Sequence, residues 1–132
     1  MKPSLIGIAL MLCPLLFSSQ AIAHGKLSAS DLEERFANTT QLCQKEKDKS
    51  TCTTYFSAEG VIKRRLHDTN ERREGTWEAD LEHDQLCITW AGKTKALCFD
   101  VYQNKDGTLD MYKGGKHLST VLNLLPGNAE RL

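Results

Sequence analysis

The sequence lacks the short motifs that mark the commonest enzyme sites. It contains no Gly-x-Ser-x-Gly nucleophile elbow, no His-Glu-x-x-His zinc motif and no glycine-rich phosphate loop. Glu82, His83 and Asp84 do occur together, but in a predicted turn, where a dry pocket that shifts their pKa values is difficult to build. We therefore predict a protein that is not an enzyme and that holds no cofactor.

The sequence also lacks an excess of charge of either sign. Lysine and arginine together number 17, and so do aspartate and glutamate, which gives a formal net charge of +0. A dedicated nucleic-acid-binding protein normally carries a basic excess. The balance therefore argues against nucleic acid as a partner.

Long hydrophobic runs are absent except near the N-terminus. There the sequence LIGIALMLCPLLF follows Lys2, and small residues end at Ala23, which is the pattern of a secretory signal peptide over 1–23. The apolar run is too short to span a bilayer, and Pro14 interrupts it. We therefore predict a periplasmic or secreted protein with a single domain over 24–132 and no transmembrane span after the signal is removed.

Removal of the signal takes one cysteine away and leaves Cys43, Cys52, Cys87 and Cys98. An even number in a small exported domain predicts two disulfides, and a zinc site is disfavoured because no Cys-x-x-Cys spacing occurs. Three pairings are possible. If residues 91–94 form a hairpin turn, Cys87 lies directly opposite Cys98, close enough for a disulfide. Cys43 and Cys52 would close the charged loop between them in the same way.

One helix followed by short strands is predicted. Ser28 is a candidate N-cap, and Leu32 and Phe36 share one face, which predicts a helix over 29–37. Turn sequences then recur between short segments rich in Thr, Val, Ile and aromatic residues. This pattern predicts a mainly β fold, an antiparallel up-and-down meander of about eight strands that forms a small lipocalin-like barrel. The predicted strands lie near 40–45, 51–56, 61–67, 75–79, 85–90, 95–102, 108–112 and 117–124.

Gly75 and Trp77 form a Gly-x-Trp sequence. It resembles the feature of lipocalin-like barrels in which the tryptophan plugs one end of the barrel. The alternative is that Trp77 is an ordinary core residue.

A wider pattern is formed by the order YFSAEGVI, GTWEAD, LCITW, CFDVYQNKDG and LLPGNAERL. It resembles a group of small exported bacterial proteins of unassigned function, which share Tyr-Phe-x-x-x-Gly, Gly-x-Trp, Cys-x-x-Trp, Cys-x-x-Val and a terminal Pro-Gly-Asn. The resemblance covers most of residues 24–132. It implies a calycin-like β-meander and no activity, so no catalytic residue follows from it.

The candidate binding residues are Arg64, Arg65, Trp77, Trp90 and Tyr102. On a strand, Arg64 faces the same way as Ile62, toward the barrel, whereas Arg65 faces the other way. An arginine on the barrel side could meet an anionic ligand or an acidic partner. The alternatives are an ion pair with Glu74 or Glu78 across the hairpin, or solvated charge that protects a strand edge.

His24 would be the first residue after signal removal. A histidine at that position offers its amino group and its imidazole together, the arrangement that binds copper in histidine-brace proteins. A third ligand would have to be His67, His83 or His117, none of which is placed by a motif. Periplasmic copper binding through His24 is one alternative, and a disordered terminus is the other.

Two further functions stay open. The first is an exported, non-enzymatic binding protein for an unidentified small ligand or protein partner. The second is an inhibitor or accessory protein that acts on an exported enzyme through exposed loops. An eight-stranded barrel has room for side chains or for one small ligand. If the side chains all point inward, the barrel is filled and a protein partner is favoured; these are Trp77, Trp90, Phe99 and Tyr102. If Trp90 and Tyr102 point outward, neither the small ligand nor the protein partner is favoured. We expect a monomer.

Overall fold

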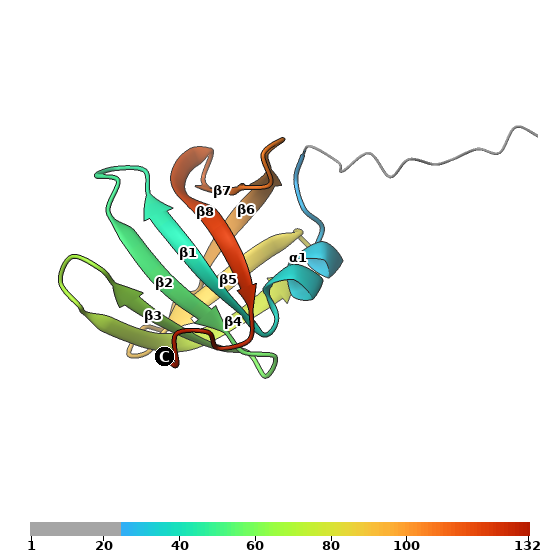
Figure 1. The fold of residues 1–132 in the computed structure, drawn as a ribbon. Helices are drawn as coiled ribbons and strands as arrows, with labels where there is room; N and C mark the ends of the chain where they lie inside the picture. The colour runs from blue at the N-terminus through green and yellow to red at the C-terminus, as the bar shows by residue number, and fades with distance from the viewer. Residues whose placement is uncertain (1–24) are drawn as a thin grey trace, which may run out of the picture.

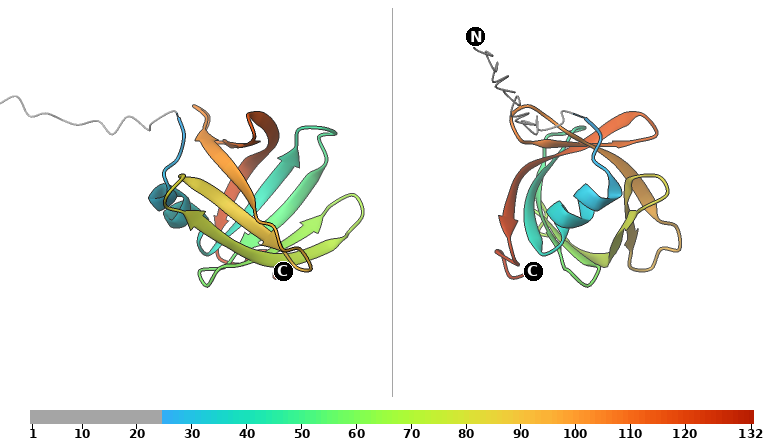
Figure 2. Two further views of the ribbon diagram at one scale, coloured as in Figure 1. Left: turned by 180° about the vertical axis from the view of Figure 1, so that it is seen from behind. Right: turned by 90° about the vertical axis from the view of Figure 1, so that its right-hand side faces the viewer.

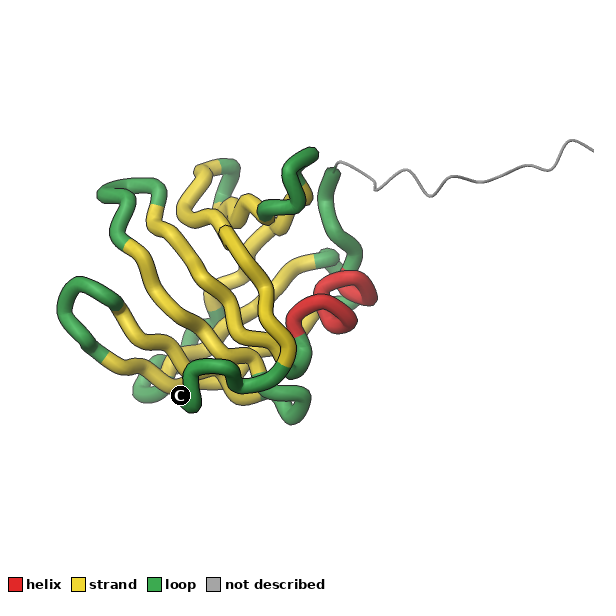
Figure 3. The backbone as a smooth tube through the Cα atoms, viewed as in Figure 1, coloured by secondary structure: helices red, strands yellow, loops and turns green. Residues whose placement is uncertain are grey.

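A short helix precedes eight antiparallel strands that close into a barrel (Figure 1). The computed structural model describes residues 25–132, so the predicted signal peptide and His24 lie outside the described residues. Each strand pairs with its neighbours in the sequence, and β1 pairs with β8 to close the sheet. The elements are α1 (Ala29–Phe36), β1 (Thr39–Lys45), β2 (Thr51–Phe56), β3 (Val61–Leu66), β4 (Arg72–Asp80), β5 (Gln85–Trp90), β6 (Leu97–Gln103), β7 (Leu109–Lys113) and β8 (Lys116–Pro126). The predicted β-meander is therefore confirmed, and Figure 3 shows the loops that join its strands.

Two strands begin more than one residue from the predicted position. β4 begins at Arg72 instead of 75, and β6 begins at Leu97 instead of 95. The Ala91 N–H donates to the Glu74 carbonyl at 2.9 Å, so the end of β5 stays paired with β4. On the other edge of β5, the ladder with β6 stops at Ile88 and Leu97.

Helix α1 begins at the predicted cap. The Ser28 hydroxyl accepts a hydrogen bond from the Asp31 N–H, and the Asp31 carboxylate accepts one from the Ser28 N–H, which is a complete capping box. Leu32 and Phe36 are both 0% exposed, and Figure 2 shows the helix lying across one end of the barrel. We call this end the helix end. Within residues 25–132, no helix has the length and apolar character needed to cross a membrane.

The segment before the helix completes the wall beside β6. The Leu27 N–H donates to the Val101 carbonyl at 2.8 Å, and the Gln103 N–H donates to the Gly25 carbonyl at 3.0 Å. These bonds provide partners for backbone N–H and C=O groups of β6 in the part of the strand that does not pair with β5.

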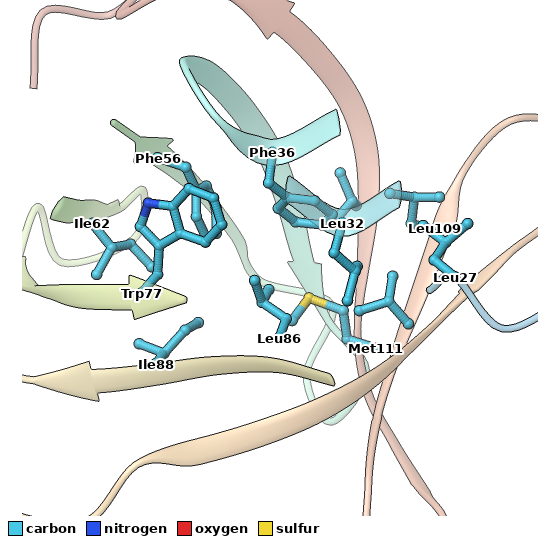
Figure 4. Close-up of a cluster of buried hydrophobic side chains, with 12 residues drawn as sticks. Leu27, Leu32, Phe36, Phe56, Ile62, Trp77, Leu86, Ile88, Leu109 and Met111 are labelled. Carbon is cyan, nitrogen blue, oxygen red and sulfur yellow. The ribbon is translucent and has the colours of Figure 1, made fainter. Parts of the chain in front are cut away.

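The helix end of the barrel is filled with apolar side chains (Figure 4). Phe56 packs edge-to-face against Phe36 and against Trp77, with ring centroids 5.1 and 5.4 Å apart. The Trp77 indole N–H donates to the Ser57 carbonyl at 3.0 Å, so this buried polar atom is satisfied. Trp77 is thus part of the core. The other members are Leu27, Leu32, Ile62, Leu86, Ile88, Val101, Leu109, Met111 and Val121.

Both predicted disulfides are present. Cys43 and Cys52 are directly opposed in the β1–β2 ladder, and Cys87 and Cys98 are directly opposed in the β5–β6 ladder. Cys87 lies between the core residues Leu86 and Ile88, and its side chain therefore points to the outer side of the barrel. The two disulfides close sequence separations of 9 and 11 residues.

Candidate binding sites

A row of polar side chains lies inside the barrel, beyond the apolar core. Gln41 is directly opposed to Thr54 in the β1–β2 ladder, and Thr54 is directly opposed to Arg64 in the β2–β3 ladder. Arg64 is two residues after the fully buried Ile62, so both side chains leave β3 on the inner side. Gln41 is 2% exposed and Thr54 is 1% exposed. We call these three residues the inner row.

Arg64 is the charged member of the inner row, and it is half-buried. Its Nε donates to the Thr54 hydroxyl at 3.1 Å, and its guanidinium carbon lies 4.8 Å from the centroid of the Trp90 ring. Within residues 25–132, no carboxylate lies within ion-pair distance, 4.0 Å, of this guanidinium. The predicted alternative, an ion pair with Glu74 or Glu78, is therefore not formed.

The charge on Arg64 is unfavourable in this environment. Burial lowers its pKa to about 10, and the positive charge of Arg73 adds to the shift. Arg73 is the directly opposed residue in the β3–β4 ladder. Two guanidinium groups thus face each other across the hairpin, and an anion beside Arg64 would relieve the repulsion.

Gln41 adds a second donor. In the described residues its Nε2 atom is buried and has no hydrogen-bond partner. A buried amide that lacks an acceptor costs on the order of 1–3 kcal/mol, which a hydrogen-bonding ligand would recover. Arg64 therefore lacks a carboxylate partner, Gln41 Nε2 lacks any acceptor, and both residues flank Thr54.

Trp90 supplies an aromatic wall for Arg64. It is half-buried and packs against the core from β5. Gly75 lies directly opposite it in β4, and a Cβ atom on Gly75 would clash with the Thr89 carbonyl oxygen and lie 2.9 Å from the Trp90 Cα. The glycine thus permits a close approach of the two backbones, which positions the indole beside Arg64.

The adjacent arginine belongs to the outer surface. Arg65 lies 3.7 Å from the Glu130 carboxylate, measured between Nη2 and Oε2.

A small cavity of about 250 Å³ adjoins the β3–β4 hairpin. Its lining residues are Lys63, Arg64, Arg72, Arg73, Glu74 and Leu132. Four cationic side chains against one acidic side chain give this cavity a positive potential.

Tyr102 points outward instead of into the barrel and is 37% exposed. It lines a groove of about 550 Å³ on the outer side of β6 and β7. We call this cavity the outer groove. Its lining residues are Gly25, Asp100, Tyr102, Gln103, Asn104, Asp110, Tyr112 and Gly115. Tyr102 was predicted as a binding residue, whereas the other members of the groove were not.

The three histidines proposed as third copper ligands lie in separate surroundings. His67 contacts the hydroxyls of Thr51 and Thr53, each at 2.7 Å. His83 Nδ1 lies 2.8 Å from Asp80. His117 lies 3.4 Å from Asp110. In the part of the chain that the structure describes, no group of three or more histidine, cysteine, aspartate or glutamate residues is placed to hold a metal ion. Because His24 lies outside that part, copper binding stays a prediction.

The turn that contains Glu82, His83 and Asp84 supports the helix. The Ala29 N–H donates to the Asp84 carboxylate at 2.8 Å, which satisfies one of the free amides in the first helical turn. His83 is exposed, and its bond to Asp80 raises its pKa. The His83 and Asp84 side chains therefore have structural partners at the surface.

Comparison of the chain with protein-family models, with curated proteins and with solved structures found no match. The resemblance to small exported bacterial proteins stays a prediction. The site must therefore be interpreted from its own chemistry.

Proposed function

We propose that this chain is an exported, non-enzymatic binding protein that holds an anionic ligand against Arg64. The observation that carries the proposal is the half-buried guanidinium of Arg64, which has no carboxylate partner in residues 25–132. Buried charges in proteins are normally paired, because an unpaired charge is costly. An oxyanion is the group that would pair with it.

The surroundings of Arg64 favour an oxyanion over a neutral ligand. The inner row offers two donors: the guanidinium of Arg64, which bonds only to the Thr54 hydroxyl, and the amide Nε2 of Gln41, which has no acceptor within residues 25–132. Charge-assisted bonds from arginine to a carboxylate or a phosphate are about twice as strong as neutral hydrogen bonds. A carboxylate and a phosphate share this chemistry, so the experiment has to separate the two.

The test is a nuclear magnetic resonance titration of the uniformly ¹⁵N-labelled protein with inorganic phosphate, acetate and benzoate in turn. We expect at least one of these anions to shift the Trp90 indole resonance and the amides of Gln41 and Thr54. Arg64→Met should weaken binding by roughly tenfold or more, as expected for loss of a charge-assisted bond. Arg64→Lys retains the charge and should weaken it less.

Arg35→Met is the matched control, because Arg35 lies in the last turn of α1, outside the cavity that Arg64 lines. It should bind the anion as the wild type does. The proposal fails if none of the three anions shifts the inner-row resonances, or if Arg64→Met and Arg35→Met weaken binding equally. Native mass spectrometry of protein purified from the periplasm of a bacterial host would then identify any ligand that co-purifies.

A second candidate is the inhibitor or accessory protein. Trp77, Trp90 and Phe99 belong to the core or pack against it, but Tyr102 faces outward, so the condition that would favour a protein partner is met only in part. Leu42 of β1 and Leu125 of β8 are 37% and 45% exposed. A partner that docks there should be released by Leu42→Glu, whereas anion binding by the inner row should be unchanged.

A further inference from the structure

The outer groove has a regular alternation of acidic and aromatic side chains. In the β6–β7 ladder Tyr102 is directly opposed to Asp110, and Asp100 is directly opposed to Tyr112. Val101 and Met111 belong to the core, so the four residues on either side of them point outward. The segment at Gly25 forms the remaining wall. The groove volume of about 550 Å³ falls within the range of small-molecule sites, roughly 300–1,000 Å³.

The carboxylates and one amide oxygen of the groove offer free hydrogen-bond acceptors. Asp100 Oδ1 receives bonds from Lys26 and Gln85, and Asp110 Oδ1 receives one from Thr120. Their Oδ2 atoms have no partner within residues 25–132, and the buried Gln103 Oε1 has none either. The lining contains two carboxylates and no lysine or arginine. A ligand for this groove should therefore donate hydrogen bonds and carry positive charge.

The aromatic rings are placed to receive the same charge. The Tyr102 and Tyr112 rings are perpendicular, with centroids 5.3 Å apart, and His117 stacks on Tyr112 at 5.0 Å. This contact with His117 orients Tyr112, while Tyr102 stays accessible. A cation within about 6 Å of a tyrosine ring is attracted by the negative potential of the ring face. Tyr102 and the directly opposed carboxylate of Asp110 would thus act on one cation.

The chain itself shows that an ammonium group fits beside this surface. The Lys26 Nζ lies 3.0 Å from Asp100 Oδ1 and donates to the His83 carbonyl at 3.1 Å. Burial opposes the charged form of Asp100, but the hydrogen bonds from Lys26 and Gln85 outweigh it, so the pKa of Asp100 lies below its ordinary value. Asp100 therefore stays ionised under physiological conditions.

We propose that the outer groove is a second binding site, distinct from the inner row, and that it takes an ammonium or guanidinium group. Such a group could belong to a free polyamine or to a lysine or arginine side chain of a peptide. The two sites then have opposite polarity: the inner row presents unpaired donors, and the outer groove presents unpaired acceptors beside aromatic rings.

The test uses three probes on the ¹⁵N-labelled full chain: spermidine, acetyl-trilysine amide and cellobiose as an uncharged comparison. We expect spermidine, the peptide or both to shift the amides of Tyr102, Asn104 and Tyr112, and cellobiose to leave them unchanged. Tyr102→Leu and Asp110→Asn should each weaken binding about threefold, as estimated for an exposed cation–π contact and an exposed ion pair. A response to spermidine alone assigns the site to polyamines, and a response to the peptide alone assigns it to basic proteins.

Two matched controls separate groove binding from general attraction to acidic side chains. Asp68 is an exposed aspartate in the turn between β3 and β4, and Tyr55 is a tyrosine of β2 outside the groove. Asp68→Asn and Tyr55→Leu should bind the probes as the wild type does. The proposal is overturned if no probe shifts the groove amides, if cellobiose shifts them as strongly, or if Asp68→Asn weakens binding as much as Asp110→Asn.

Discussion

Arg64 and Arg73 lie directly opposite each other in the β3–β4 ladder, so two positive charges occupy one cross-strand pair. Arg73 contacts the Glu71 carboxylate, with Nε and Oε1 3.3 Å apart, whereas Arg64 contacts only the hydroxyl of Thr54 and the ring of Trp90 among the described polar and aromatic partners. Like charges in directly opposed positions destabilise a sheet, and burial of one of them adds to the cost. The pair therefore lowers the stability of the ligand-free protein.

Arg64→Met should consequently stabilise the ligand-free protein. We expect the free energy of unfolding to rise by about 1 kcal/mol, because an apolar side chain of similar length replaces a partly buried charge. Urea unfolding of the wild type and the variant gives the difference. The exposed control, Arg72→Met, should stay within about 0.5 kcal/mol of the wild type. A clear loss of stability in Arg64→Met would mean that the contacts of the guanidinium with Thr54 and Trp90 outweigh the repulsion from Arg73.

The two disulfides should differ in how much they stabilise the fold. Replacing Cys87 and Cys98 with alanine should lower the free energy of unfolding by about 2.5–3 kcal/mol, the value expected from chain entropy for a loop of this length. Replacing Cys43 and Cys52 should cost more, because their side chains point into the barrel, as those of Gln41 and Thr54 do, and their removal leaves a cavity there, whereas Cys87, which is as buried as Cys43, points to the outer side. Parallel urea titrations of the two double variants make the comparison. A larger loss for the outer pair would contradict the inward placement of Cys43 and Cys52.

Gly75→Ala should be strongly destabilising. A Cβ atom there clashes with the backbone of β5 at Thr89 and Trp90, and backbone cannot move as easily as a flexible side chain. We expect a loss of about 3 kcal/mol, at the upper end for overpacking. Gly25→Ala is the control, since nothing lies within 4 Å of a Cβ at that position, and it should change stability by less than about 0.5 kcal/mol. Thermal unfolding monitored by circular dichroism measures the stability of both variants. Equal losses in Gly75→Ala and Gly25→Ala would argue against the close approach of the β4 and β5 backbones.

The contact between Lys26 and Asp100 should give a defined pH dependence. The folded-state pKa of Asp100 lies below the ordinary value of 3.8, so its contribution to stability is present above that value and is lost as the pH falls through the folded pKa. The wild type should therefore be more stable than Asp100→Asn at pH 6, and the difference should shrink at pH values below 3.8. Urea unfolding across this range measures it. If the stability advantage of the wild type over Asp100→Asn grows as the pH falls, the pH dependence has the opposite sign, and the ionised contact is ruled out.

Local pattern was enough to predict much of the fold. Cys87 and Cys98 lie in one hairpin, so the turn between them fixes their opposition without knowledge of the rest of the chain. Strand alternation likewise predicted that Arg64 and Arg65 face opposite sides of the sheet. The start of β6 was not predicted, because the tight turn assumed at residues 91–94 would have paired residues 95 and 96 with β5, whereas the ladder begins at Leu97.

The candidate sites depend on contacts between distant parts of the chain. Thr40 and Gln41 are both buried, which breaks the alternation expected of β1. The outer side of Thr40 is covered by the C-terminal segment, with its hydroxyl bonded to Gly127 and Ala129. The sequence around Gln41 contains no pattern that would predict that its amide points into the barrel as a hydrogen-bond donor. The outer groove, by contrast, could have been found by applying the alternation rule to β6 and β7 together.

Closure of the barrel also orders the events of folding. Seven of the ladders join strands that are neighbours in the sequence, whereas the β1–β8 ladder joins the two ends of the described chain. Hairpins form locally and quickly, while the long-range ladder must wait for the last strand to arrive. Until then β1 is an unprotected edge that can pair with another chain. The nascent protein is therefore most prone to aggregate just before β8 docks, and a chaperone that shields β1 would act at that step.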